Sequence, residues 1–194
     1  MKVNVLIDGG FLEQALKKKQ KRLSIVEIEA EVSNAIQKLK NKDGLSEAEL
    51  FRVLYYDCYP FEGKAKDPQG TDIDFCTTPT VDFKKTLLND ISKHERYALR
   101  LGQLSFQGWK AHPQGNSTSP PTPIFQQKGV DMKCGLDIAV MSIKKSVDLI
   151  LIIAGDSDFI APLKTARKEG VLVAIYRMGL PVKDDLIRHC DFDL

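Results

Sequence analysis

The stretch Leu149-Ile150-Leu151-Ile152-Ile153-Ala154-Gly155-Asp156-Ser157-Asp158-Phe159 decides the fold that this sequence predicts. Its first six residues are apolar without interruption, which is typical of a parallel strand that is buried on both faces of a sheet. Two carboxylates, Asp156 and Asp158, follow this strand directly. In open α/β sheets, ligands bind at the carboxyl ends of the strands. Two neighbouring anions at this edge favour a divalent cation with oxygen ligands between them.

The rest of the chain alternates between strand-like and helix-like patterns. Ser24 and Glu27 fit a capping box at the start of one helix. Residues 57–79 are rich in Pro and Gly, and we expect an irregular excursion there. Strands are expected at 3–7, 50–56, 97–106 and 171–176. Helices are expected at 11–40 (with a break near 23–24), 82–93 and 158–168, with a short helix in 180–194. Residues 128–131 lead into a further helix that carries Leu136, Ala139, Val140 and Ile143. This alternation predicts a three-layer α/β/α domain around a central, mainly parallel sheet.

Length and composition indicate an ordinary globular domain. A chain of 194 residues with 43% hydrophobic residues suits a single domain over residues 1–194. Residues 111–124 are rich in Pro, Ser, Thr and Gly, and we expect a mobile loop there. The net charge of +2 does not by itself indicate nucleic-acid binding. We find no signal peptide, and no apolar run approaches the roughly 18 residues that span a bilayer, so we expect no membrane partner.

The cysteine spacing and the glycine motifs exclude further classes. The four cysteines include no C-x-x-C pair, which indicates reduced thiols and a cytoplasmic protein rather than a zinc site or a disulfide framework. Asp8-Gly9-Gly10 follows the first strand without the G-x-G-x-x-G spacing, and no Walker motif is present. We therefore expect no nucleotide cofactor.

Further carboxylates occur where strand ends should meet. Asp8 follows the first strand, and Asp131 precedes the helix that leads to the central strand. Asp137 lies on that helix, although Lys133 at i−4 offers it a simple ion pair. Such acids suit Mg²⁺ or Mn²⁺. Each acid also has a structural interpretation, because Asp8 or Asp158 could cap the helix that follows it.

Several other side chains are candidates for contacts with a substrate. The candidates are Ser157, the lysines Lys128, Lys133 and Lys164 for phosphate, and Trp109 for stacking on a base. Surface lysines are more often neutral in binding, and a single Trp more often packs or anchors a loop.

Three of these segments together resemble a known family. They are Val5-Leu6-Ile7-Asp8-Gly9-Gly10, Lys128-Gly129-Val130-Asp131 running on to Leu136-Asp137, and Ala154-Gly155-Asp156-Ser157-Asp158-Phe159 with Pro162-Leu163. In order and spacing the chain resembles the NYN domains of the LabA-like group, within the PIN-like nuclease superfamily. The resemblance implies a PIN-like α/β/α fold, a metal-dependent ribonuclease site, and metal-binding roles for Asp8, Asp131, Asp156 and Asp158, with Asp137 as a further ligand.

The sequence and the resemblance together predict the function. We expect a ribonuclease that hydrolyses RNA phosphodiester bonds with Mg²⁺ or Mn²⁺, with Asp8, Asp131, Asp156 and Asp158 as catalytic residues. The alternative is a regulatory RNA- or protein-binding module of the same fold. Many members of the family follow the first Asp with a G-x-N pattern, whereas Phe11 stands here after Gly10, and this departure favours the alternative. A homo-oligomer is compatible with either function.

Overall fold

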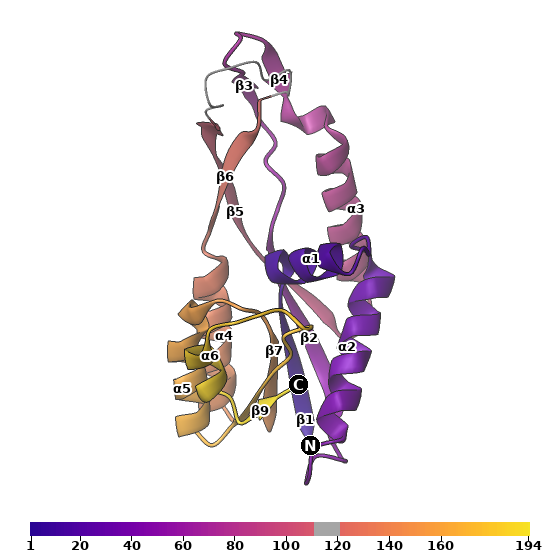
Figure 1. The fold of residues 1–194 in the computed structure, drawn as a ribbon, viewed down its shortest axis with the longest axis vertical. Coiled ribbons are helices and arrows are strands. Elements are labelled where there is room, and N and C mark those ends of the chain that lie inside the picture. The colour runs from indigo at the N-terminus through magenta and orange to yellow at the C-terminus, as the bar shows by residue number, and fades with distance from the viewer. Residues whose placement is uncertain (111–120) are drawn as a thin grey trace.

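The computed structural model describes residues 1–110 and 121–194, and a seven-stranded sheet runs through it (Figure 1). The strand order is β6-β5-β2-β1-β7-β8-β9. The strands are β1 (Lys2–Asp8), β2 (Glu49–Cys58), β5 (Tyr97–Trp109), β6 (Pro123–Lys128), β7 (Leu149–Ile153), β8 (Leu172–Ile175) and β9 (Phe192–Asp193). All neighbouring pairs are parallel except β5 and β6. The expected apolar strand, β7, is buried at every residue beside β1.

Helices cover both faces of the sheet and complete the three layers (Figure 1). One face packs against α1 (Gly9–Lys18), α2 (Ile25–Lys40) and α3 (Pro79–Lys93), and the other against α4 (Val130–Ile143), α5 (Ile160–Lys168) and α6 (Asp184–Arg188). The two hydrophobic cores use alternate residues of each strand, as Val5 and Leu6 of β1 illustrate. The expected α/β/α architecture is confirmed.

The expected helix boundary near Ser24 is present, and its cause is local. The Ser24 hydroxyl accepts a hydrogen bond from the backbone N–H of Glu27 at 3.3 Å, so α2 begins at a side-chain cap. Among the described residues, no helix combines the length and the apolar character needed to cross a membrane.

Two segments differ from the expectation. The excursion at 57–79 contains a short hairpin, β3 (Lys64–Lys66) with β4 (Asp72–Asp74), and a 3-10 turn, η1 (Phe75–Thr77). The expected loop at 111–124 lies outside the described residues at 111–120, but Pro123 and Ile124 begin β6 instead of ending a loop. Strands β5 and β6 and the small hairpin form an arm at the top of Figure 1.

An aromatic cluster explains why this arm forms. The rings of Phe61, Phe75, Phe106, Phe125 and Trp109 lie 5.5–5.9 Å from their neighbours within the cluster. They come from segments that are distant in sequence, so local periodicity could not reveal their pairing.

Candidate active site

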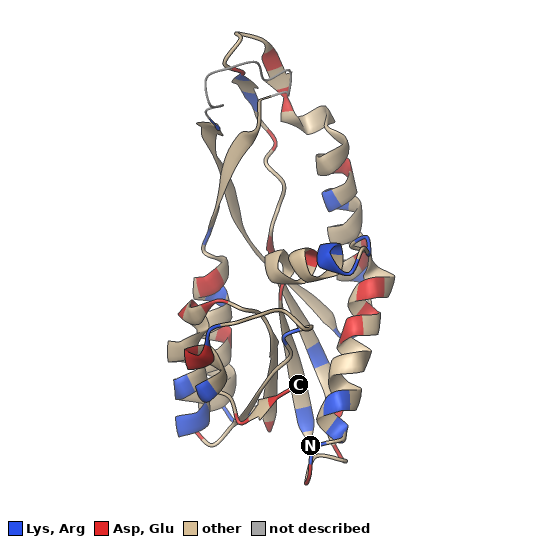
Figure 2. Ribbon diagram, viewed as in Figure 1, with Lys and Arg blue, Asp and Glu red and all other residues tan. Residues whose placement is uncertain are grey.

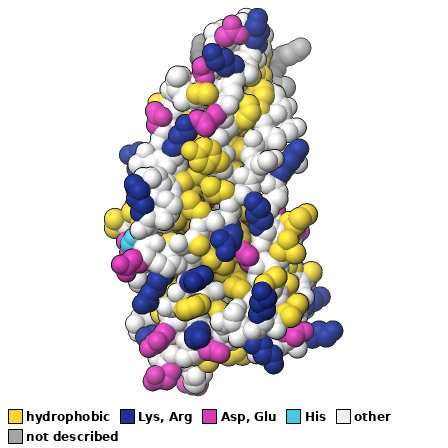
Figure 3. Space-filling view, turned by 180° about the vertical axis from the view of Figure 1, so that it is seen from behind, with side chains coloured by type: hydrophobic (Ala, Val, Ile, Leu, Met, Phe, Trp, Pro, Cys, Tyr) yellow, Lys and Arg dark blue, Asp and Glu magenta, His cyan; other side chains and the backbone are white. Residues whose placement is uncertain are grey.

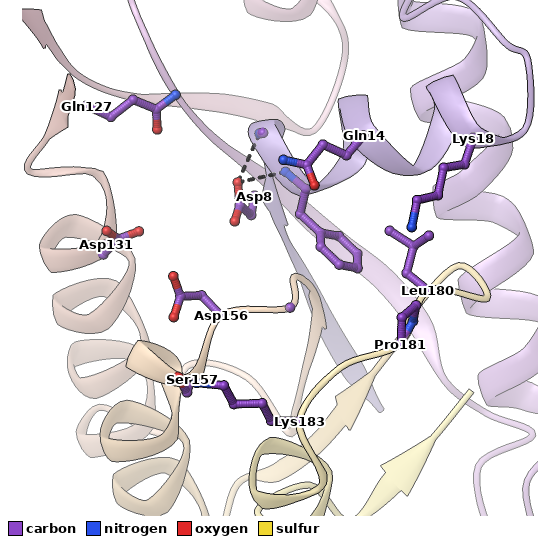
Figure 4. A pocket seen from close by; sticks show the side chains of 13 residues that line it. Asp8, Gln14, Lys18, Gln127, Asp131, Asp156, Ser157, Leu180, Pro181 and Lys183 are labelled. Atoms are coloured by element: carbon purple, nitrogen blue, oxygen red, sulfur yellow. Dashed lines mark hydrogen bonds between the residues drawn. The ribbon is translucent and has the colours of Figure 1, made fainter. Parts of the chain in front are cut away.

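An acidic pocket lies at the carboxyl ends of β1 and β7. Because Ile7 of β1 pairs with Ile153 of β7, the residues that follow both strands leave the sheet at the same edge. The pocket has a volume of about 630 Å³. Asp8, Asp131 and Asp156 stand around it from three separate segments (Figure 4). Its wall consists of Asp8, Gly10, Phe11, Gln14, Lys18, Gln127, Asp131, Gly155, Asp156, Ser157, Leu180, Pro181 and Lys183.

Asp8 is both the last residue of β1 and the N-cap of α1. Its Oδ1 atom accepts hydrogen bonds from the backbone N–H groups of Gly10 at 2.9 Å and Phe11 at 3.2 Å (Figure 4). Burial raises the pKa of Asp8, the two N–H groups oppose this rise, and the charges of Asp131 and Asp57 add to it. The two backbone N–H groups therefore fix the position of the Asp8 carboxylate, and other negatively charged side chains lie near it.

Asp131 and Asp156 approach the pocket from two other elements. Asp131 lies in the first turn of α4, just after Gly129, whose φ of +79° lets the chain turn from β6 into the helix. Asp156 caps the 3-10 turn η2 (Ser157–Phe159), since its Oδ1 atom accepts the N–H of Asp158 at 3.0 Å. Desolvation raises the pKa of Asp131, and the negative charges of Asp156 and Asp158 raise it further. Electrostatic repulsion therefore acts between these acids across the pocket.

The three pocket carboxylates have the chemistry of a divalent-cation site. Their oxygens are the hard donors that Mg²⁺ and Mn²⁺ prefer. Among the hydrogen bonds of the described residues, Asp8 and Asp156 use only Oδ1, so each keeps a second oxygen. Within residues 1–110 and 121–194, however, no three acidic, His or Cys side chains form a group that could hold a metal ion.

Two of the expected acids do not line the pocket. Asp158 is exposed in η2, where it acts on Asp131 only through its charge. Asp137 accepts hydrogen bonds from Tyr56 Oη and Arg100 Nε, both at 2.8 Å. It follows Asp131 by six residues on α4, about 9 Å along the axis and on a different side of the helix. The structure thus places Asp137 in a polar contact between α4 and the sheet, away from the acidic pocket.

Of the Ser and Lys candidates for substrate contacts, Ser157 lines the pocket and the three lysines do not. Ser157 lines the pocket, and its hydroxyl accepts a hydrogen bond from Lys183 Nζ at 3.3 Å. Lys128 at the end of β6 and Lys164 on α5 are exposed and do not line it. Lys133 donates to the carbonyl of Leu101.

Trp109 lies in the distal arm rather than at the acidic pocket. Its Nε1 atom donates to the carbonyl of Lys66 at 2.7 Å, and its ring packs on Phe75 and Phe106. It therefore anchors the arm, which was the structural alternative for this residue.

Sequence reasoning missed the neutral and basic part of the pocket wall. Gln14 and Lys18 follow Gly10 at intervals of four, so the helical period could have placed them on the same side of α1 as the cap. Gln127 and Lys183 carry no comparable local signal. Phe11 also lies in the wall: a Cβ atom on Gly155 would come 2.6 Å from the Phe11 ring, so the glycine is required for this close packing.

A buried ion pair behind Asp8 was also missed. Asp57, near the carboxyl end of β2, is almost completely buried, and its Oδ2 atom lies 2.5 Å from Lys84 Nζ of α3. Its Oδ1 atom accepts the backbone N–H of Cys58 at 2.7 Å. Asp57 does not line the pocket. Its Oδ2 atom would lie 2.6 Å from a Cβ atom on Gly9, and its negative charge raises the pKa of Asp8. Asp57 could have been found by the rule that was applied to Asp8, because it is also an acid near the carboxyl end of a strand.

Comparison with known proteins gives one result. The family model of the NYN domain matches residues 84–193, which is more than half of the chain. Asp131 and Asp156 lie within this range, whereas Asp8 precedes it. No curated protein and no solved structure gave a significant match. With its mainly parallel sheet between two helical layers, the chain belongs to the NYN domain family, which is part of the PIN-like nuclease superfamily.

Proposed function

We propose that this protein is a ribonuclease that hydrolyses RNA phosphodiester bonds in the acidic pocket with the help of Mg²⁺ or Mn²⁺. The observation that carries the proposal is the placing of Asp8, Asp131 and Asp156, from three separate segments, around one pocket in a NYN fold. Acids without a ligand between them repel one another: the pKa of Asp131 is raised mainly by desolvation, and the charges of Asp156 and Asp158 raise it further.

The three carboxylates would hold the cation. When bound, such a cation supplies an activated water at neutral pH and neutralises charge on the phosphodiester. Asp158 would contribute indirectly, through its charge on Asp131 and through the N–H that it donates to Asp156. Asp8, whose Oδ1 atom is used by its helix cap, would offer Oδ2 to the cation.

Other residues of the wall would bind and orient the RNA. Lys18 and Lys183 supply positive charge beside the acids, where a phosphate would otherwise be repelled. The side-chain amides of Gln14 and Gln127 offer donors and acceptors for hydrogen bonds. The ring of Phe11 forms an apolar part of the wall that excludes water from one side of the site.

The second candidate is a regulatory module that binds RNA or protein without turnover. Two observations favour it: Phe11 occupies the position next to Asp8-Gly9-Gly10 with an apolar ring, and the described acids form no group ready to hold a metal ion. Under this function the pocket would bind its ligand but would show no hydrolysis with either cation.

A cleavage assay separates the two candidates. Labelled RNA would be incubated with purified protein in Mg²⁺, in Mn²⁺ and in EDTA. We expect cleavage only with a divalent cation, and a loss of at least about a hundredfold in rate for Asp156→Asn, because the change removes an anionic oxygen. Asp90→Asn, at an exposed position on α3, is the matched control and should cleave normally. Absence of cation-dependent cleavage in the wild type would favour the regulatory module.

A further inference from the structure

A basic hollow lies at the end of the sheet opposite the acidic pocket. The first residue of β5, Tyr97, pairs with Val53 of β2. The residues of β2 that precede Val53 therefore extend beyond the start of β5. Arg96 Nη1 donates to the carbonyl of Leu50 at 3.0 Å and lies along this extension. The hollow has a volume of about 880 Å³, and four cations line it against a single acid, Glu49. The four are Lys2, Lys40, Arg52 and Arg96.

None of the four cations takes part in a salt bridge with a described residue. None of their side-chain nitrogens lies within 4.0 Å of a carboxylate oxygen in the part of the chain that the structure describes. Elsewhere, Lys19, Lys84 and Arg177 are each paired with an acid. In a chain with a net charge of only +2, four unpaired cations at one hollow are a local concentration of positive charge. Such a concentration attracts a polyanion.

An aromatic ring organises two of these cations. Phe51 is 41% exposed. Lys2 Nζ lies 5.6 Å from the centre of its ring, and Arg52 Cζ lies 5.3 Å from the same point. Cation–π attraction holds both side chains beside the ring without neutralising them. The planar Arg52 guanidinium can then bind phosphate oxygens in a bidentate manner.

The positions of Lys and Arg around the hollow favour an extended polyanionic ligand that lies along the surface. Lys and Arg occur on the lower parts of β1, β2 and α2 in Figure 2, which is the end where both strands begin. Seen from behind, the lower half of the molecule carries Lys and Arg side chains among hydrophobic ones, with several Asp and Glu side chains between them (Figure 3). Lys2 and Asp8 stand at opposite ends of β1, about 20 Å apart at the usual rise per residue.

We propose that this hollow binds the phosphate backbone of single-stranded RNA and thereby holds it on the protein at a distance from the acidic pocket. The identity of the polyanion rests on the proposed ribonuclease function. The acids of the pocket repel RNA, and Lys18 and Lys183 offset this repulsion only in part, whereas the hollow supplies four cations without any metal. RNA binding should therefore persist in EDTA.

The test is fluorescence anisotropy of a short labelled single-stranded RNA in EDTA, over a range of KCl concentrations. Lys40→Gln/Arg52→Gln should weaken binding by about tenfold or more at low salt. It should also reduce the slope of log K against log salt by about 1.4, because each phosphate contact with a single strand contributes about 0.7. Lys17→Gln/Lys168→Gln, which removes two exposed cations in the last turns of α1 and α5, should bind as the wild type does. Unchanged melting temperatures would show that both double variants fold.

Several outcomes would overturn the inference. These are equal loss in both double variants, no loss in Lys40→Gln/Arg52→Gln, or binding to anionic phosphatidylglycerol vesicles without binding to RNA. The proposed function fails separately: a wild type that binds RNA through the hollow but never cleaves it contradicts the ribonuclease and leaves the inference standing. Asp156→Asn should retain RNA binding in EDTA, since it lies outside the hollow.

Discussion

Asp8 and Asp156 each cap a helical segment and also form the wall of the acidic pocket. The structural and the functional interpretations of these acids are therefore compatible. The cap uses Oδ1 in both residues, so an Asn side chain, which also has an oxygen at this position, can retain the cap while it loses the negative charge. Replacement by Asn is thus the sharpest way to separate folding from function at these two positions.

At the residue scale, Asp156→Asn should lower the pKa of Asp131. Desolvation is the larger cause of the raised pKa and remains, but the repulsion from Asp156 disappears. The pKa of Asp131 in the folded protein lies above its unfolded value of 3.8, so the native state holds this proton more tightly. Stability in the absence of metal is therefore lost as pH rises from 3.8 through the raised pKa, and the variant should lose less.

The measurement is an NMR titration of the Asp131 carboxyl carbon in both proteins. An unchanged pKa for Asp131 would contradict the electrostatic coupling across the pocket. Asp90→Asn, remote on α3, is the control and should leave the titration as it is in the wild type.

At the element scale, the Asp57–Lys84 pair joins β2 to α3 behind the site. Lys84→Met should destabilise the protein by about 3 kcal/mol or more, because it leaves a buried carboxylate without its cation. Lys85→Met is a matched control on the same helix, since Lys85 pairs with Glu62 in a much more exposed setting and its loss should change stability little. Chemical denaturation measures both, and equal stabilities for the two variants would contradict the importance of the buried pair.

Elements whose cause is local could be predicted from the sequence, and elements that depend on distant partners could not. The buried strand Leu149–Ile153 and the cap at Ser24 follow from adjacent residues, and both are present. Strand β6 was missed because its partner is the distal half of β5, across a Pro-rich segment. The hydrogen bonds of Asp137 to Tyr56 and Arg100 could not be predicted for a similar reason, because both partners are distant in sequence.

At the scale of the whole molecule, the fold separates charge along its strands. The carboxyl ends of β1 and β7 bring Asp8 and Asp156 to one pocket, while the beginnings of β1 and β2 bring Lys2 and Arg52 to one hollow. The net charge of +2 conceals this separation. Parallel strands make it predictable in part, because acids that follow different strands meet at one edge. The basic hollow was not predicted, since its residues come from four segments with no shared motif.

The central claim is that the acids of the pocket bind a divalent cation, and thermal unfolding tests it most directly. Wild type and Asp156→Asn would be melted with and without Mn²⁺. At about a hundredfold excess over Kd, Mn²⁺ should raise the Tm of the wild type by about 5–10 °C. In Asp156→Asn the rise should largely disappear, while the metal-free Tm equals or slightly exceeds that of the wild type, because one repulsive charge is gone. Equal stabilisation of both proteins by Mn²⁺ would contradict the claim.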